Sequence, residues 1–251
     1  MWSNFATRID DRILLALTSL VGRSASFDGA MQALSHASLA NGVFVMAVFC
    51  WYWFRQAAPA TAQRTREQLL GAMIAAVGGL FVARVMAQTL PFRLRPRFEP
   101  ALHLAWPAAP DALGFVDWSA FPSDHAVMFS ALAAGLCFVS WRTGLGLLLF
   151  TLFIVSLPRV YYGLHYPTDV FAGMALGALF AYGMNATPVN RRIAGRLLLF
   201  ERRSPRVFQA ALIVVAFEFA TMFNGVRSVA REAFHLGGRL LASALAGLTG
   251  H

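Results

Sequence analysis

The chain of 251 residues is 58% hydrophobic and only 13% charged, with a mean hydropathy of +0.58. A soluble domain carries about 25% charged residues, so this composition excludes a water-soluble globule as well as a disordered chain. The formal net charge is +9, and all 21 basic residues are arginine. These arginines lie mostly between apolar runs and accompany no nucleic-acid-binding motif, so we expect membrane topology to explain them. Both cysteines lie in apolar runs, which indicates neither a disulfide framework nor a zinc site.

Six segments are apolar enough to cross a bilayer core, which requires about 20 residues of α-helix. The sequence therefore predicts an all-α, polytopic membrane helix bundle with about six transmembrane helices. The predicted spans are roughly 37–54, 68–90, 125–141, 144–160, 168–187 and 207–224. Gly173 and Gly177, four residues apart in the fifth span, favour close packing against a neighbouring helix.

Amphipathic segments flank this bundle at both ends. In residues 8–35, apolar side chains recur at helical spacing beside charged ones, and Thr7 with Asp10 reads as a capping box. We expect an amphipathic N-terminal helix lying on the membrane, with a short span as the alternative. After residue 225, basic residues recur every fourth position above an apolar face, which favours a headgroup-binding helix. The predicted division is 1–35, a transmembrane domain at 36–225, and a basic amphipathic helix at 226–251.

The distribution of arginine predicts the orientation of the bundle. Many arginines lie in the first, third and fifth connections between spans, so these connections should be cytoplasmic. The second and fourth connections, 91–124 and 161–167, then face outward. Arg93, Arg95 and Arg97 in the second connection depart from this pattern, so they require another explanation.

The first polar cluster in the outward connections is Arg95-Pro96-Arg97, which follows the second span. Pro96 fixes the backbone, so both guanidinium groups are presented at the interface, where their geometry suits phosphate oxygens. Gln88 lies seven residues before Arg95. Taken alone, arginines at a helix end more often extend to lipid headgroups.

The second cluster, Ser123-Asp124-His125, opens the third span. Ser123 is placed to cap this helix, whose free backbone N–H groups would form an anion site. His125 would stand at the rim of that site, able to donate a proton. An ordinary helix cap with an interfacial histidine is the alternative.

The third cluster extends from Arg159 to Asp169, around the start of the fifth span. Pro167 suits the first turn of that helix, so His165 should lie just before the helix and Asp169 inside its first turn. A carboxylate there can accept the ring N–H of His165 and leave the other ring nitrogen free as a nucleophile.

Together the three clusters resemble the type 2 phosphatidic acid phosphatase superfamily of membrane lipid phosphatases. The family pattern is Lys-x6-Arg-Pro, then Pro-Ser-Gly-His, then Ser-Arg-x5-His-x3-Asp, and it corresponds here to residues 88–169. Gln88 replaces the Lys, Asp124 the Gly and Pro158 the Ser. The form Phe-Pro-Ser-Asp-His is similar to the bacterial undecaprenyl pyrophosphate phosphatase branch. The charge that Gln88 lacks can come from one of three arginines, Arg84, Arg93 or Arg97.

The resemblance implies a phosphatase that needs no metal or cofactor. His165 would attack phosphorus and form a phosphohistidine, Asp169 would orient it, and His125 would protonate the leaving oxygen and then activate water. The residues expected to bind the phosphoryl group are Arg95, Arg97, Arg159, Ser123, Asp124 and Gln88. The implied substrate is a polyprenyl diphosphate, and the only other expected partners are membrane lipids, not nucleic acid. The implied location is the bacterial inner membrane, with the active site facing the periplasm or outside.

Other functions remain open. A phosphatase acting on phosphatidylglycerophosphate or phosphatidic acid, or a lipid phosphotransferase, would share the same motifs. A vanadium haloperoxidase has related motifs, but its soluble character disagrees with the hydropathy. A transporter or scaffold with a degenerate site would fit the intramembrane charges Arg84 and Glu218. A buried ion pair between these two residues fits them equally well and is the preferred interpretation. The sequence does not define the lipid tail or the oligomeric state.

Overall fold

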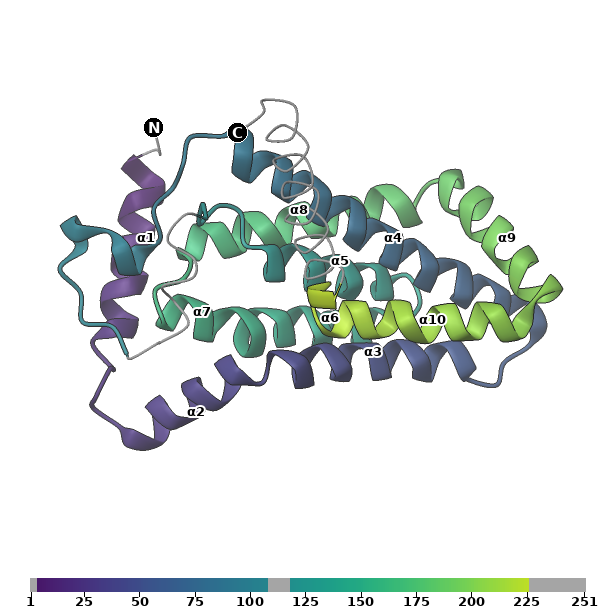
Figure 1. The fold of residues 1–251 in the computed structure, drawn as a ribbon, viewed down its shortest axis with the longest axis horizontal. Helices are drawn as coiled ribbons and strands as arrows, with labels where there is room; N and C mark the ends of the chain where they lie inside the picture. The colour runs from purple at the N-terminus through teal and green to yellow at the C-terminus, as the bar shows by residue number, and fades with distance from the viewer. Residues whose placement is uncertain (1–3, 108–117, 226–251) are drawn as a thin grey trace, which may run out of the picture.

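The computed structural model describes residues 4–107 and 118–225, and within these ranges the regular elements are all helical, as predicted (Figure 1). The predicted amphipathic helix at 226–251 lies outside the described residues. The α-helices are α1 (Asn4–Thr18), α2 (Ala25–His36), α3 (Ser38–Phe54), α4 (Pro59–Thr89), α5 (Asp124–Cys137), α6 (Trp141–Phe150), α7 (Leu157–Tyr161), α8 (Pro167–Asn185), α9 (Pro188–Arg203) and α10 (Pro205–Ala220).

The helices differ in whether each can cross a membrane alone. In the described part of the chain, two are long and apolar enough by themselves, namely α4 and the run Trp141–Tyr161. The number rises to four if the bent pairs α2 with α3 and α8 with α9 each form one span. The third and sixth predicted spans are shorter than expected, because α5 has 14 residues and α10 has 16. The protein is an all-α membrane helix bundle whose spans are less uniform than the hydropathy pattern suggests.

Prolines determine where two of these helices change direction. α8 ends at Asn185, Thr187 is extended, as a residue before proline prefers, and Pro188 starts α9 after a bend of 74°. In the run Trp141–Tyr161, a π-helical segment at 151–156 separates α6 from α7. Pro158 has no N–H to donate to the preceding turn, which accounts for a change of hydrogen-bond pattern just before it. The fourth span therefore reaches the third polar cluster through an interrupted helix.

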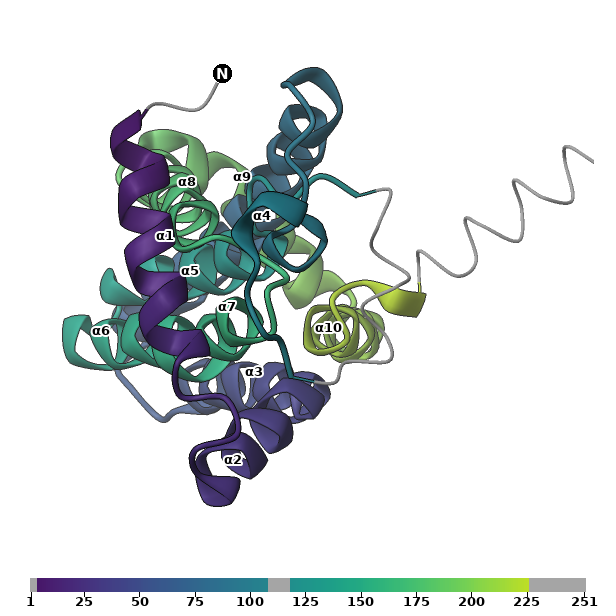
Figure 2. The same cartoon turned by 90° about the vertical axis from the view of Figure 1, so that its left-hand side faces the viewer.

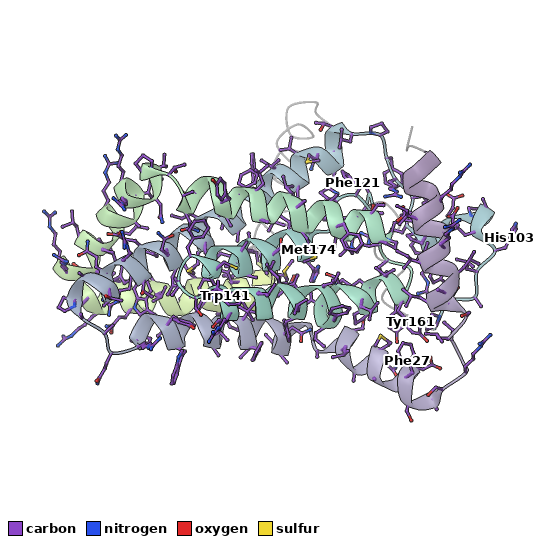
Figure 3. All side chains as sticks on the ribbon, turned by 180° about the vertical axis from the view of Figure 1, so that it is seen from behind. Phe27, His103, Phe121, Trp141, Tyr161 and Met174 are labelled. Atoms are coloured by element: carbon purple, nitrogen blue, oxygen red, sulfur yellow. The ribbon has the colours of Figure 1, made fainter. Side chains whose placement is uncertain are left out.

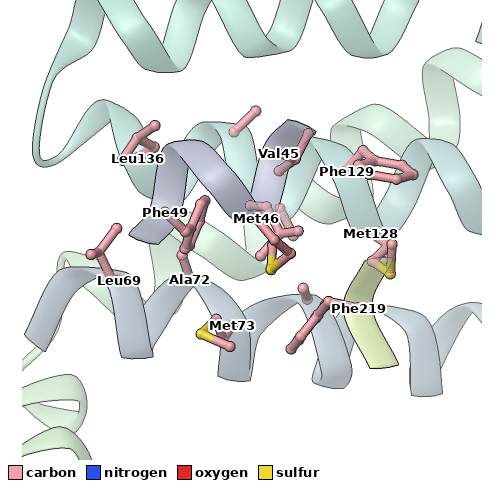
Figure 4. Close-up of a cluster of buried hydrophobic side chains, with 14 of the residues drawn as sticks. Val45, Met46, Phe49, Leu69, Ala72, Met73, Met128, Phe129, Leu136 and Phe219 are labelled. Atoms are coloured by element: carbon pink, nitrogen blue, oxygen red, sulfur yellow. The ribbon is translucent and has the colours of Figure 1, made fainter. Parts of the chain in front are cut away.

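The centre of the bundle consists of α4, α5 and α8, with α3 and α10 packed alongside. The main apolar core joins α3, α4, α5 and α10, and Figure 4 shows Met46, Met73, Met128 and Phe219 converging from these four helices. All four side chains are buried. Burial of such side chains contributes about 1.5–3 kcal/mol each, which favours this close arrangement.

The expected close packing at the glycines of α8 is confirmed. A Cβ at Gly173 would lie 2.8 Å from the Ser123 carbonyl oxygen, and one at Gly177 would lie 2.2 Å from both the Val127 carbonyl oxygen and the Ser130 hydroxyl. Only hydrogen fits at these distances. The absence of side chains therefore lets α8 approach α5 closely where residues 173–177 face residues 123–131.

The N-terminal segment forms two helices and not one. Gly22 has φ +74°, a conformation that favours glycine, and it lies in the turn between α1 and α2. Figures 1 and 2 show α1 running across the ends of the bundle helices, at the end of the molecule opposite α9. The predicted capping box is wrong, because α1 begins at Asn4 and Thr7 lies inside it. The side chain of Asp10 is completely buried, so it does not belong to a solvated face.

The glycine packing can be tested with a matched pair of substitutions in α8. We expect Gly177→Ala to destabilise the protein by about 1–3 kcal/mol, because the added methyl group must displace the backbone of α5. Gly183→Ala is the control, since a Cβ there has no other atom within 4 Å. Thermal unfolding in detergent, followed by circular dichroism, measures both. Equal unfolding midpoints for the two variants would contradict the packing described here.

Candidate active site

The three polar clusters predicted from the sequence meet at the end of the bundle crossed by α1. Figure 3 shows Tyr161 and His103 at this end and Trp141 in the other half of the molecule. Backbone hydrogen bonds hold the segments together across long sequence separations. They run from Ala120 N–H to the Arg93 carbonyl (2.8 Å), from Arg97 N–H to the Gly163 carbonyl (3.0 Å) and from Ser123 N–H to the Asp169 carbonyl (3.2 Å).

The turn between α7 and His165 depends on Gly163. This residue has φ +67°, and a Cβ on it would lie 2.8 Å from the ring of Trp106 and 2.9 Å from the Cβ of Arg97. Arg97 donates hydrogen bonds to the carbonyls of Tyr162 (2.9 Å) and Pro107 (2.6 Å). The guanidinium of Arg97, which we expected to bind phosphate, therefore holds this loop in place through hydrogen bonds to main-chain carbonyls.

His165 is buried, and its orientation comes from the main chain. Its Nδ1 lies 2.8 Å from the carbonyl oxygen of Ala120. A carbonyl only accepts hydrogen bonds, so Nδ1 carries the proton and Nε2 carries the lone pair. The expected hydrogen bond from His165 to Asp169 is not made, because Nδ1 and the Asp169 Oδ2 are 3.9 Å apart. Ala120 takes the role that we expected of the carboxylate.

The surroundings of His165 favour its neutral form. Burial lowers its pKa well below that of a free imidazole, about 6.5, and the positive charges of Arg95, Arg159 and Arg84 add to this effect against the opposing bond to Ala120. Arg95 donates to the Leu164 carbonyl at 2.6 Å. Burial lowers the pKa of Arg95 to about 10, so it remains a cation at neutral pH. A neutral imidazole thus lies among cationic groups.

Asp169 lies in the first turn of α8, as predicted, but its partners are not the imidazole. Its Oδ2 accepts a hydrogen bond from the backbone N–H of Tyr166 at 2.7 Å, and its Oδ1 forms an ion pair with Arg93. Arg93 also forms an ion pair with Asp10 of α1, at 2.6 Å. Asp169 therefore holds the loop that carries His165. Asp10 was not predicted as a site residue.

Gln88 and Arg84, one helical turn apart in α4, have different surroundings. Gln88 is exposed, whereas Arg84 forms an ion pair with Asp124 at the start of α5 and lies 4.7 Å from the ring centroid of Trp118. The suggested ion pair of Arg84 with Glu218 is wrong, because the carboxylate of Asp124 takes this place. Of the three arginines considered at the position of the family's lysine, Arg84 forms an ion pair with the second polar cluster.

Ser123 occupies the cap position of α5, but its hydroxyl makes no capping hydrogen bond to that helix. Within the part of the chain that the structure describes, the buried Oγ of Ser123 and the buried Nε of Arg159 have no hydrogen-bond partner. Such buried groups normally bind something, and both can donate to an anion. His125 follows in the first turn of α5, partly buried, with its ring centroid 6.5 Å from that of Phe129.

The family is shown by comparison with known sequences. Residues 68–193 match the family described as the PAP2 superfamily, which is half of this chain. The chain belongs to this superfamily.

Among curated relatives, the putative undecaprenyl-diphosphatase YbjG of Escherichia coli K12 is 31% identical over 176 residues, covering 67% of this chain and 79% of YbjG. Undecaprenyl-diphosphatase BcrC of Bacillus subtilis is 28% identical over 119 residues, covering 47% of this chain and 57% of BcrC. The bacitracin transport permease protein BcrC of Bacillus licheniformis is 36% identical over 90 residues, covering 36% of this chain and 44% of that protein. The chain therefore spans about half the length of the two Bacillus relatives. A solved transmembrane PAP2 type phosphatidylglycerolphosphate phosphatase of B. subtilis has a TM-score of 0.44 and 19% identity, covering 73% of this chain and 86% of that one.

The protonation state of His165 can be measured directly. The lowered pKa means that the imidazolium forms only well below pH 6.5, so at pH 6.5 the ring should be neutral with its proton on Nδ1. We expect ¹⁵N NMR of histidine-labelled protein in detergent to show this tautomer, with the His165 signal assigned by its loss in His165→Gln. A titration midpoint at or above 6.5 for that signal would contradict the environment described.

Proposed function

We propose that this protein is a membrane lipid phosphatase that hydrolyses a polyprenyl diphosphate, with His165 as the nucleophile. The observation that carries the proposal is the buried His165, whose Nδ1 lies 2.8 Å from the Ala120 carbonyl oxygen, beside Arg95, which is bonded to the Leu164 carbonyl. Burial and the charges of Arg95 and Arg159 lower the pKa of His165, which favours the neutral form that a nucleophile needs. The unpartnered donors of Ser123 and Arg159 support it, since a phosphoryl group would satisfy both. The names of two relatives, BcrC of B. subtilis and YbjG, support a diphosphate as substrate.

In the first step, Nε2 of His165 attacks the terminal phosphorus and the P–O bond to the lipid phosphate breaks. The lone pair of Nε2 forms the new P–N bond, and the lipid monophosphate departs with the electrons of the broken bond and a proton donated by His125. Nδ1 keeps its proton, and Ala120 stabilises the positive charge that develops on the ring. Arg95, Arg159 and Ser123 bind the phosphoryl oxygens, because phosphoryl transfer depends mainly on positioning and charge neutralisation.

In the second step, water hydrolyses the phosphohistidine. His125 accepts a proton from the attacking water, the P–N bond breaks, and inorganic phosphate and neutral His165 are formed. The guanidinium groups supply the positive charge that a metal supplies in other phosphatases, so we propose that the reaction is independent of metal ions. We also propose that the site faces the periplasm or outside of a bacterial inner membrane, which the distribution of arginine supports.

The proposed function is tested with the full chain in detergent. Phosphate release from a polyprenyl diphosphate should persist in EDTA and be inhibited by vanadate, which mimics five-coordinate phosphorus. His165→Gln should lose more than about 10³-fold in turnover and form no phosphoenzyme, because the nucleophile is removed. His103→Asn is the control, since His103 is exposed and its left-handed backbone tolerates asparagine. Wild-type turnover in folded His165→Gln, or loss of activity in EDTA restored by magnesium, would overturn the proposal.

The leaving group distinguishes a diphosphate from a monophosphate substrate. A phosphate monoester is a far weaker base than an alkoxide, so its departure needs less help from a general acid, help typically worth about 10²–10⁴-fold. We expect His125→Ala to retain a measurable rate of phosphoenzyme formation from polyprenyl diphosphate and nearly none from phosphatidic acid. Rapid-quench trapping of the phosphoenzyme separates this step from the water step, which also needs His125. Equal losses, with a wild-type preference for the monophosphate, would favour a monophosphate phosphatase.

The proposed orientation predicts a pattern of chemical labelling. In a background in which both native cysteines, Cys50 and Cys137, are replaced by alanine, we expect His103→Cys to react with a membrane-impermeant maleimide in intact cells. Ala60→Cys and Arg196→Cys, at the other end of the bundle, should react only after lysis. All three positions are exposed, so access to the side chain is comparable. The reverse pattern would place the site in the cytoplasm.

A further inference from the structure

The cluster around Asp10 lies outside the three motifs and is still connected to the nucleophile. Asp10 is on α1, which the sequence indicated only as an amphipathic surface helix. Its side chain is 0% exposed, and that of Arg93 is 5% exposed. Burial of a carboxylate is unfavourable unless its oxygens are paired, so its partners must compensate for this.

The partners of Asp10 are the start of α8 and Arg93. Oδ1 accepts a hydrogen bond from the backbone N–H of Thr168 at 2.9 Å, and Oδ2 accepts from the Thr168 hydroxyl at 2.7 Å. Pro167, the first residue of α8, has no N–H, so the N–H of Thr168 is the first that this helix offers. Asp10 thus supplies a negatively charged cap to α8 from another helix.

Arg93 connects Asp10 to the residues that hold His165. One of its nitrogens, Nη2, donates to Asp10 at 2.6 Å, and the other, Nη1, donates to the Thr168 hydroxyl at 2.9 Å and to Asp169. The guanidinium carbon lies 3.9 Å from the ring centroid of Tyr166, which restricts its position further. A single guanidinium therefore joins two carboxylates that come from α1 and α8.

Two routes lead from Arg93 to the imidazole of His165. Through its side chain, Arg93 holds Asp169, which in turn accepts the N–H of Tyr166 next to His165. Through its backbone, the Arg93 carbonyl accepts the N–H of Ala120, whose own carbonyl orients Nδ1. Displacement of Arg93 would move both supports of the nucleophile together.

We propose that Asp10 is a positioning residue for the loop 165–169, acting through Arg93 and Thr168, and this rests on the proposed role of His165 as nucleophile. No direct contact with substrate is part of this role. Loss of the Asp10 charge should misalign His165 without removing any group that binds phosphate. A displacement of about 1 Å at a reacting centre can cost about 10²-fold in rate.

The test compares Asp10→Asn with two controls, Asp11→Asn in α1 and Asp28→Asn in α2. We expect kcat and the rate of phosphoenzyme formation to fall by about 10–100-fold, with KM little changed. Asp11→Asn changes the same charge at the next residue of α1, and Asp28→Asn weakens the attachment of α2, because Asp28 accepts from the Gly22 N–H and the Tyr161 hydroxyl. Both controls should keep wild-type kcat. A kcat for Asp10→Asn equal to that of Asp11→Asn would overturn the proposal.

A double-mutant cycle distinguishes positioning from general destabilisation. If Asp10 acts through Arg93 on Asp169, the kcat loss from Asp10→Asn should be much smaller in an Asp169→Asn background than in wild type. His125 lies outside this network. In a His125→Ala background, Asp10→Asn should therefore lower the rate of phosphoenzyme formation by the same factor as it does in wild type. Equal losses in both backgrounds would overturn the proposal.

A second variant covers the case in which Asp10→Asn does not fold. Thr168→Val removes the hydroxyl between Asp10 and Arg93 and conserves the volume of the side chain. A lowered kcat with unchanged KM in this variant supports the proposal, whereas a wild-type kcat overturns it. The proposed function is judged separately in the same assay. Its failure is seen as absent turnover and phosphoenzyme in the wild-type chain, whereas failure of the Asp10 proposal requires an active wild type.

Discussion

The close approach of α5 and α8 determines where the polar groups of the site can stand. Because Gly173 and Gly177 lack side chains, α8 lies directly against the backbone of α5, and the first turns of both helices come together. The hydrogen bond from Ser123 N–H to the Asp169 carbonyl joins the two helices at the end of the bundle that α1 crosses. With a wider separation, the donors at the start of α5 and the imidazole before α8 would lie on separate surfaces.

Much of the fold could be predicted because it depends on local chemistry. Apolar runs indicated the helices, Pro167 marked the start of α8, and the spacing of Gly173 and Gly177 indicated the close packing. The meeting of the three clusters could also be predicted, since each borders a span whose direction follows from the number of preceding spans. The lengths of α5 and α10 could not be predicted, because an apolar run does not define the residue at which its helix ends.

The parts of the site that were not predicted depend on contacts between segments that are far apart in the sequence. His165 is oriented by the Ala120 carbonyl, and every residue type has a carbonyl, so no side-chain pattern indicates this bond. Asp10 lies four residues before the buried Leu14, on the same face of α1. This spacing was the available indication that Asp10 is buried. From the sequence alone, however, a carboxylate in an amphipathic helix is assigned to the polar face, because the sequence does not show that Arg93 lies opposite it. The roles of these residues in catalysis remain predictions.

The π-helical segment at 151–156 has a consequence for how this membrane span can change in length. A π turn contains an additional residue compared with an α turn, and the N–H of Leu157 reaches back five residues to the Leu152 carbonyl. Deletion of this additional residue would restore a regular α turn with about the same total rotation, so Arg159 would keep its direction relative to α5 and α8. A deletion in the regular α-helix before it would instead rotate Arg159 by about 100°, because each residue of an α-helix corresponds to a rotation of that size. The π-helical segment is therefore a position at which this span can lose one residue without turning its arginine away from the site.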